Sequence, residues 1–198
     1  MKKITLILGD ITAIAVDAMV NTAHASLQGG SGLCYTIHKK GGVVLQQECK
    51  QLYAEHGLLL DGSAEVTSAG NLPAHHVIHA VGPRWLDGTH NEDQLLYDTY
   101  KNTLLKADLI QAQTLSIPSI ATGIHGFPKQ QAALIAMQAM IDILPHCIHL
   151  NTVLLVNTSV DNCQLYLQEF VKFAEKTGTV RLESLLPGRL ARLARLAE

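Results

Sequence analysis

Short runs of apolar residues recur along the chain, each bounded by glycine, proline or polar residues. Runs of this length, ended by turn-forming residues, are typical of strands. The pattern predicts strands at residues 4–9, 18–21, 65–70, 76–81, 114–118 and 152–156. Because near-continuous apolar strands are characteristic of parallel sheets, the pattern favours a sheet that is covered on both faces.

Between these runs, apolar residues recur with the spacing of amphipathic helices. This spacing predicts helices at residues 33–40, 43–56, 91–112, 130–144 and 159–176. The inward-facing residues expected from it are Val44, Leu45, Cys49, Leu95, Leu96, Tyr100, Leu104, Leu105 and Leu109. Strands that alternate with helices indicate an α/β fold, here a three-layer α/β/α sandwich with a mixed, mostly parallel sheet.

Two glycine-rich loops each lie between a predicted strand and a predicted helix. The first holds Gly29, Gly30, Ser31 and Gly32, and the second runs over residues 119–128. Glycines let backbone N–H groups approach an anion, and a helix N-terminus adds unpaired donors and partial positive charge. If both loops face one crevice at the carboxyl ends of the strands, they can grip a diphosphate from two sides.

Composition narrows the class of protein. The 198 residues suit one domain, and a formal charge of −2 argues against nucleic-acid binding through a broad basic surface. No apolar run reaches the length of a membrane span, and the chain starts directly in a strand, not in a signal peptide. Cysteines 34, 49, 147 and 163 form no Cys-x-x-Cys pair, which favours a reduced, cytoplasmic setting. No metal site or cofactor is expected.

The composition changes near the C-terminus, which divides the chain into a domain at residues 1–178 and a tail at 179–198. Residues 188–198 are basic and have the spacing of a short amphipathic helix, with Leu190, Leu193 and Ala197 on one side. An exposed tail is the simplest interpretation. Contact with a second subunit or with an anionic surface is the alternative.

Several segments, which follow one another in the family's order and spacing, resemble the macro domains that bind ADP-ribose. They are similar to the O-acetyl-ADP-ribose deacetylase branch of that family. The matching segments are residues 9–12 (GDIT), 16–23 (VDAMVNTA), 27–32 (LQGGSG), 37–38 (IH), 79–83 (HAVGP) and 122–128 (TGIHGFP). The similarity covers roughly residues 3–175. It implies the macro domain fold, and ADP-ribose or an ADP-ribosylated protein as the partner.

The resemblance also implies roles for individual residues. Asp10 accepts a hydrogen bond from the adenine amino group, the Ile11 N–H reaches a ring nitrogen, and Asn21 faces the distal ribose. Two walls of backbone form the phosphate cradle. The first consists of Gly29, Gly30, Ser31, Gly32 and Leu33, and the second of Thr122, Gly123, Ile124, His125 and Gly126. Phe127 is the apolar wall at the distal sugar.

Simpler structural roles compete with these assignments. Asp is a preferred N-cap, so Asp10 can cap the turn at Thr12, and Asn21 can satisfy local backbone groups. His38 is expected to be a packed, hydrogen-bonded histidine of the first helix. His75 and His79 share one face of a strand, but no third ligand is visible there, so a zinc site built on them is not expected.

The chain departs from the family where the chemistry of hydrolysis is expected. His24 stands where hydrolases of the family carry a second Asn, and Cys34 stands where they carry the Asp that activates water. A thiol of ordinary pKa is protonated at neutral pH and orients water poorly. Loss of a positioned base commonly removes roughly 10²–10⁴-fold in rate. Tyr35 replaces a small residue and raises the question of whether its ring fills the cleft.

Two more departures concern the walls of the site. His125 replaces a Tyr or Phe, and residues 157–158 (Asn-Thr) stand where an aromatic ring often stacks on adenine. Stacking contributes ~1–3 kcal/mol per base, so affinity for adenine is expected to fall unless another residue compensates. His24, Cys34 and His125 all map near the distal ribose. They therefore suggest a Cys–His nucleophilic pair or a metal site as a further hypothesis.

These observations leave three functions open. The favoured one is a binder of ADP-ribose or ADP-ribosyl groups whose hydrolase activity is weak or lost. The second is an active ADP-ribosyl hydrolase or O-acetyl-ADP-ribose deacetylase that uses His24 and Cys34 in a non-standard catalytic loop. The third is a degenerate macro fold that serves as an interaction scaffold. The sequence does not indicate the oligomeric state.

Overall fold

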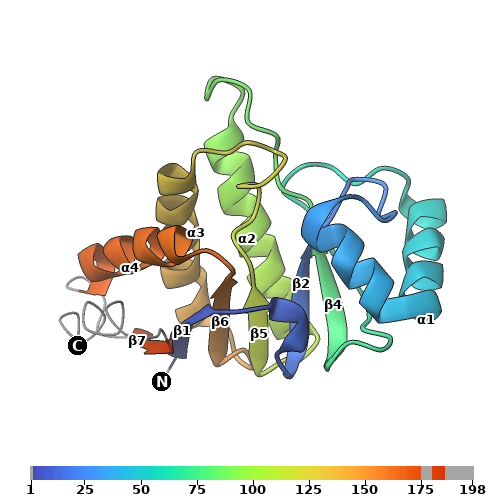
Figure 1. Cartoon of the computed structure of the whole chain (residues 1–198), viewed down its shortest axis with the longest axis horizontal. Coiled ribbons are helices and arrows are strands. Elements are labelled where there is room, and N and C mark those ends of the chain that lie inside the picture. The colour runs from blue at the N-terminus through green and yellow to red at the C-terminus, as the bar shows by residue number, and fades with distance from the viewer. Residues whose placement is uncertain (1, 175–179, 186–198) are drawn as a thin grey trace.

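Strands and helices alternate along the chain in the structure, a computed structural model that describes residues 2–174 and 180–185 (Figure 1). The strands are β1 (Lys2–Leu8), β2 (Val16–Thr22), β3 (Ala64–Ser68), β4 (Ala74–Ala80), β5 (Thr114–Ile117), β6 (Thr152–Asn157) and β7 (Val180–Leu185). The helices are α1 (Gly32–His56), α2 (Glu92–Leu109), α3 (Lys129–Ile143) and α4 (Val160–Ala174), with short 3₁₀ turns η1 (Ile11–Ala13) and η2 (Leu144–His146).

The strands form one mixed sheet in the order β3-β4-β2-β5-β6-β1-β7. Only the β3–β4 pair is antiparallel in the described chain, and the remaining pairs are parallel. Parallel neighbours need a crossover connection, and helices supply it here. The predicted α/β class with a mostly parallel sheet is therefore confirmed.

Helices cover both faces of this sheet (Figure 1). Side chains of successive strand residues point to opposite faces, so Ala18 and Val20 join the core beneath α2, α3 and α4. Met19, between them, joins the smaller core beneath α1. Because the central strands are buried on both faces, they read as near-continuous apolar runs in the sequence.

Of the four α-helices that the structure describes, α1 is the one that covers the other face, and it bends sharply within its length (Figure 1). The sequence predicted two helices, at residues 33–40 and 43–56, and the structure joins them across Gly42, whose φ is 80° and ψ −162°. Few L side chains adopt this backbone conformation, so glycine is suited to the bend. The turn after β3 packs against the bend, where the Asn71 N–H donates to the Gly41 carbonyl at 3.0 Å.

Three residues expected in the core are exposed instead. Val44 is 54% exposed, Leu105 45% and Leu109 75%, although Leu45, Cys49, Leu96, Tyr100 and Leu104 are buried as predicted. Helical spacing identifies one apolar face, but the neighbouring elements decide how much of it is covered. Val43 and Val44 come directly after the bend at Gly42, and both are exposed. Leu105 and Leu109 border a shallow surface hollow on α2.

Strand β7 lies beside β1, in parallel register from Lys2 opposite Val180 to Ile7 opposite Leu185. The sequence pattern had placed this segment in the tail, with no strand. The predicted amphipathic helix at residues 188–198 lies outside the described residues. No helix in residues 2–174 and 180–185 is long and apolar enough to cross a bilayer.

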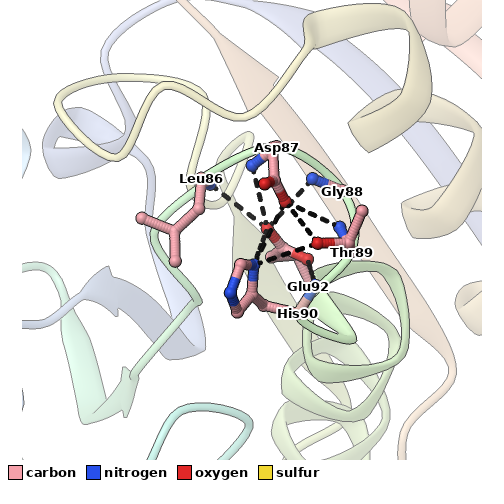
Figure 2. A network of polar contacts seen from close by, with 6 residues as sticks. All are labelled: Leu86, Asp87, Gly88, Thr89, His90 and Glu92. Carbon is pink, nitrogen blue, oxygen red and sulfur yellow. Dashed lines mark hydrogen bonds and ion pairs between the residues drawn. The ribbon is translucent and has the colours of Figure 1, made fainter.

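A buried carboxylate organises the loop before α2 (Figure 2). Glu92 Oε1 accepts backbone N–H bonds from Leu86, Asp87 and Gly88 at 3.1–3.3 Å, and Oε2 accepts one from His90 at 2.6 Å. Burial alone would raise the pKa of Glu92, but these donors outweigh it and lower the pKa to about 2. The negative charge of Glu92 therefore holds the loop in one conformation.

We expect Glu92→Gln to lower the melting temperature at neutral pH, because the amide has no charge and only one acceptor oxygen. The folded pKa of about 2 lies below the ordinary value of 4.5. The stabilisation is therefore complete above pH 4.5 and disappears as the pH falls toward 2. Thermal unfolding of both proteins across this range should show their difference shrinking on acidification. The exposed Glu55→Gln serves as the matched control, and an equal effect from it would contradict the prediction.

Candidate functional site

A cleft of about 380 Å³ opens where β1, β2, β5 and β6 end. Ligand sites of open α/β sheets lie at the carboxyl ends of their strands, and this cleft has that position. Its lining comes from the ends of these strands, the loops that follow them and the loop after β4, and from the start of α1 and of α4. The lining residues are Gly9, Asp10, Ile11, Thr22, Ala23, Ser31, Gly32, Leu33, Gly82, Pro118, Ser119, Ile120, Ala121, Thr122, Gly123, Ile124, His125, Val156, Asn157, Thr158 and Asn162.

The two predicted walls line this cleft in part, with residues 31–33 on one side and 122–125 on the other. Ser31 is the N-cap of α1, and its side chain makes no capping hydrogen bond, so the N-terminal N–H groups of the helix lack that partner. On the other wall, the N–H groups of Gly123, Ile124 and His125 make no hydrogen bond within the described chain. Among the residues that the structure describes, no Lys or Arg lines the cleft. The cleft therefore offers an anion backbone donors and the helix dipole.

Asp10 has the capping role, one of the two roles that the sequence left open. Its Oδ1 accepts from the Thr12 N–H at 2.9 Å and from the Thr12 hydroxyl at 2.6 Å, so it caps the turn η1. Lys40 Nζ lies 3.1 Å from its Oδ2. The hydrogen bonds from Thr12 and the charge of Lys40 keep the pKa of Asp10 below its ordinary value, so the carboxylate at the rim of the cleft stays ionised.

Amide side chains occupy the end of the cleft next to β6 and α4. Asn157 Oδ1 accepts a short hydrogen bond from the Ser119 hydroxyl, whereas its buried Nδ2 has no partner. The buried Oδ1 of Asn162 has none either. These atoms leave a donor and an acceptor available near the cleft. The sequence had placed Ser119 in the second glycine loop and had named residues 157–158, but it gave no site role to Ser119 or Asn162. The only signal for Asn162 was its place near a helix start.

Seven of the residues predicted for the site do not line the cleft. They are Asn21, His24, Gly29, Gly30, Cys34, Gly126 and Phe127. Phe127 is buried in the larger core, where its ring meets Trp85 edge-on with 4.7 Å between centroids. Gly126 closes a turn by donating to the Gly123 carbonyl at 3.0 Å. His125 does line the cleft, with its Nδ1 3.2 Å from the Pro83 carbonyl.

Asn21 and Cys34 belong to a buried polar network behind the cleft. Asn21 Nδ2 lies 3.1 Å from His79 Nδ1 and 3.7 Å from Cys34 Sγ, and its Oδ1 has no partner. The Nε2 of His79 lies 2.9 Å from the Thr67 hydroxyl and 3.5 Å from Cys49 Sγ. Burial and the neighbouring His38 lower the pKa of His79 to about 3, so its ring is neutral at physiological pH.

The proposed grouping of His24, Cys34 and His125 as a metal site is wrong. Two groups of three potential ligands converge within 4.8 Å in the described chain, and none of these residues belongs to either. His24 is exposed and hydrogen-bonds to the Ser26 hydroxyl, whereas Cys34 is buried beside Asn21, with 5% of its surface exposed. The distance between them follows from the fold, because Cys34 faces inward on α1 and His24 lies on the surface loop before it.

A second cavity, of about 510 Å³, lies on the other side of the Gly29 loop. Tyr35 is 55% exposed and lines this cavity, and it is not among the residues that line the cleft. The ring of Tyr35 lies 5.9 Å from Lys39 Nζ. His38 and Cys49 also line the second cavity. His38 is buried as predicted, but its Nε2 has no hydrogen-bond partner, contrary to expectation.

Comparison with known proteins gives consistent matches. The model of the family described as "Macro domain" matches residues 20–136. A macro domain-containing protein of Acinetobacter sp. (strain ED45-25) is 53% identical over 84% of this chain and 91% of its own length. O-acetyl-ADP-ribose deacetylase 1 of Pantoea vagans (strain C9-1) is 46% identical over 85% of this chain and 98% of its own.

Solved structures agree with these relatives. A mutant Oceanobacillus iheyensis macrodomain with ADPR superposes with a TM-score of 0.81 at 32% identity, covering 87% of this chain and 93% of that one. The Trypanosoma brucei macrodomain in complex with ADP-ribose gives 0.74 at 27% identity, over 82% of this chain and 67% of that one. Sequence and structure together show that this chain belongs to the macro domain family.

Proposed function

We propose that this chain binds ADP-ribose, free or attached to a protein, in the cleft at the carboxyl ends of β1, β2, β5 and β6. The observation that carries the proposal is the pair of walls that present backbone N–H groups without a partner among the described residues. Such groups hold a diphosphate without a cationic side chain. The relatives named O-acetyl-ADP-ribose deacetylase and the macrodomain structures titled with ADP-ribose support this ligand.

The orientation of the nucleotide follows from the side chains at each end. The ionised Asp10 at the rim is an acceptor for the adenine amino group, and Ile11 lies beside it. Asn157 and Asn162 line this end of the cleft and offer polar contacts to the base. The diphosphate then lies between Ser31 and the loop around Gly123.

We further propose that hydrolysis by this chain is slow or absent. Neither His24 nor Cys34 lines the cleft, and within residues 2–174 and 180–185 Asp10 supplies its one carboxylate. A general base must come within hydrogen-bond reach of the attacking water, directly or through one water molecule. The second candidate function is a deacetylase or hydrolase, favoured by the names of relatives that are 42–46% identical.

Calorimetry with ADP-ribose tests the binding proposal. We expect saturable binding with one site per chain. A Cβ at Gly123 would meet no atom within 4 Å, so Gly123→Ala and Gly123→Val should fold normally and yet place methyl groups in the cleft. Affinity should fall in that order, by at least about tenfold for valine. A flat titration of the wild-type chain would refute the binding proposal and favour the scaffold interpretation.

Variants at Asp10 separate capping from ligand recognition. Asp10→Asn keeps an acceptor for Thr12 and should retain wild-type stability, whereas Asp10→Ala should lose about 1 kcal/mol as caps do. Both should bind ADP-ribose at least about tenfold more weakly, because the asparagine amide has no second acceptor for the adenine amino group. Thermal unfolding and calorimetry measure the two effects. Asp93→Asn, away from the cleft, should change neither, and unchanged affinity in Asp10→Asn would exclude the adenine contact.

A hydrolysis assay tests the proposal of slow or absent activity. We expect release of acetate from O-acetyl-ADP-ribose to be roughly 10²–10⁴-fold slower than with the Pantoea vagans relative measured in parallel. Cys34→Ser and His24→Ala should leave the residual rate unchanged, because neither side chain lines the cleft. A wild-type rate within tenfold of the relative, abolished by Cys34→Ser, would instead support a catalytic cysteine.

A further inference from the structure

Three potential metal ligands from separate parts of the chain converge behind the Gly29 loop. His38 and Cys49 come from α1 and His79 from β4, and one ligand atom of each lies within 4.8 Å of the others. All three side chains are buried. His79 Nε2 and Cys49 Sγ are 3.5 Å apart. That separation is about the edge of a zinc tetrahedron with a 2.3 Å Zn–S and a 2.0 Å Zn–N bond.

The bend in α1 is what brings His38 and Cys49 together. In a straight helix, residues eleven positions apart would be separated by about 16 Å along the axis. Gly42 interrupts the helix between them with a φ of 80°, and Figure 1 shows the two halves of α1 at an angle. The backbone of α1 is therefore shaped so that ligands from both of its halves meet over β4.

The cluster contains polar atoms that the protein leaves unsatisfied. His38 is 5% exposed, and its Nε2 has no hydrogen-bond partner in the structure. Buried polar groups are seldom left unpaired, because desolvation without a hydrogen bond costs about 1–3 kcal/mol. His38 and Cys49 also line the second cavity, which gives an ion a route from solvent. An unpaired imidazole and an entry path are two features that a metal site requires.

The surroundings of His79 complete the arrangement. Asn21 lies 3.1 Å from His79 Nδ1, and its own Oδ1 has no partner. Half a turn of this amide would let Oδ1 accept from Nδ1–H, which leaves the Nε2 lone pair for a metal. Metal-bound histidines usually donate their second N–H to such a carbonyl or carboxylate oxygen. Thr67, now 2.9 Å from Nε2, would keep its hydrogen bond to the Ser68 carbonyl.

We propose that His38, Cys49 and His79 bind a thiophilic divalent cation of the zinc class, with the fourth coordination position open to the second cavity. Two imidazoles and one sulfur favour zinc over magnesium or calcium, which prefer oxygen ligands. Burial lowers the pKa of both histidines, so both rings are neutral, as metal ligands must be. Burial raises the pKa of the Cys49 thiol to about 12, so it is protonated without metal and releases its proton to solvent when the ion binds.

The other convergent group consists of Asp87, His90 and Glu92, and most of its carboxylate oxygens already accept hydrogen bonds. Both oxygens of Glu92 already accept backbone N–H bonds, as Figure 2 shows. Asp87 Oδ1 accepts from Thr89 and lies 3.1 Å from His90 Nδ1. A cation there would have to displace these donors, so the first group is the candidate site.

Occupancy of the site would affect the wall of the ADP-ribose cleft. The Gly29 backbone packs on His38, since a Cβ at Gly29 would lie 3.7 Å from the Cβ and Cγ of that histidine. The loop continues directly into Ser31, the N-cap that faces the cleft. An ion that fixes His38 would therefore stiffen the loop from behind.

A cobalt titration of the metal-free full chain tests the proposal. Co²⁺ should bind with one equivalent per chain and produce the near-ultraviolet charge-transfer band of a cobalt–thiolate bond, and Zn²⁺ should abolish it. Cys49→Ser should lose the band and at least tenfold in affinity. The matched controls are Cys147→Ser, a buried thiol elsewhere, and Cys34→Ser, the neighbouring thiol on α1; both should keep the band. His38→Gln should keep the band but bind at least tenfold more weakly.

The wild-type titration decides the outcome even if a variant fails to fold. Absence of saturable binding overturns the proposal, and so does cobalt that binds without the thiolate band. Survival of the band in Cys49→Ser also overturns the proposal, whether or not Cys34→Ser loses the band. Thermal unfolding of wild-type protein gives a second readout, because an ion that binds only the folded state must raise the melting temperature. An unchanged melting temperature at saturating Zn²⁺ contradicts the proposal.

Discussion

The common direction of β1, β2, β5 and β6 is the constraint on which the site depends. Parallel strands place all their carboxyl ends at one edge, so the loops that follow them meet there. The start of α1 and the loop around Gly123 are about ninety residues apart in the chain, yet both border the same cleft. Their donors belong to the main chain, and side-chain substitution leaves them in place.

This arrangement separates ligand binding from hydrolysis. Donors that hold a diphosphate depend on backbone position, whereas water activation depends on one side chain with the right basicity and reach. The chain keeps the first feature, but Cys34 packs behind the cleft beside Asn21 and His24 bonds Ser26 at the surface. Under the proposed function, recognition of ADP-ribose therefore does not require a base at this position.

Helix α1 borders both the cleft and the second cavity. Its first turn borders the cleft, and its inner side, bent at Gly42, supplies His38 and Cys49 to the second cavity. The bend fits against the turn after β3, where a Cβ at Gly70 would lie 2.1 Å from the Gly41 carbonyl oxygen. Direct backbone contact between Gly41 and Gly70 thus fixes the bend in α1, and the proposed metal site depends on that bend.

Local patterns were sufficient to predict the alternation of strands and helices, the two glycine loops and the position of Asp10 after β1. Spacing and turn chemistry act over a few residues, and these features need nothing more. Tertiary packing decided that Val44 faces solvent, that Phe127 meets Trp85 in the core and that β7 pairs with β1. It also brought His38, Cys49 and His79 together, because their convergence depends on a helix bend and on a strand thirty residues beyond Cys49. No periodicity in the chain encodes contacts over such distances.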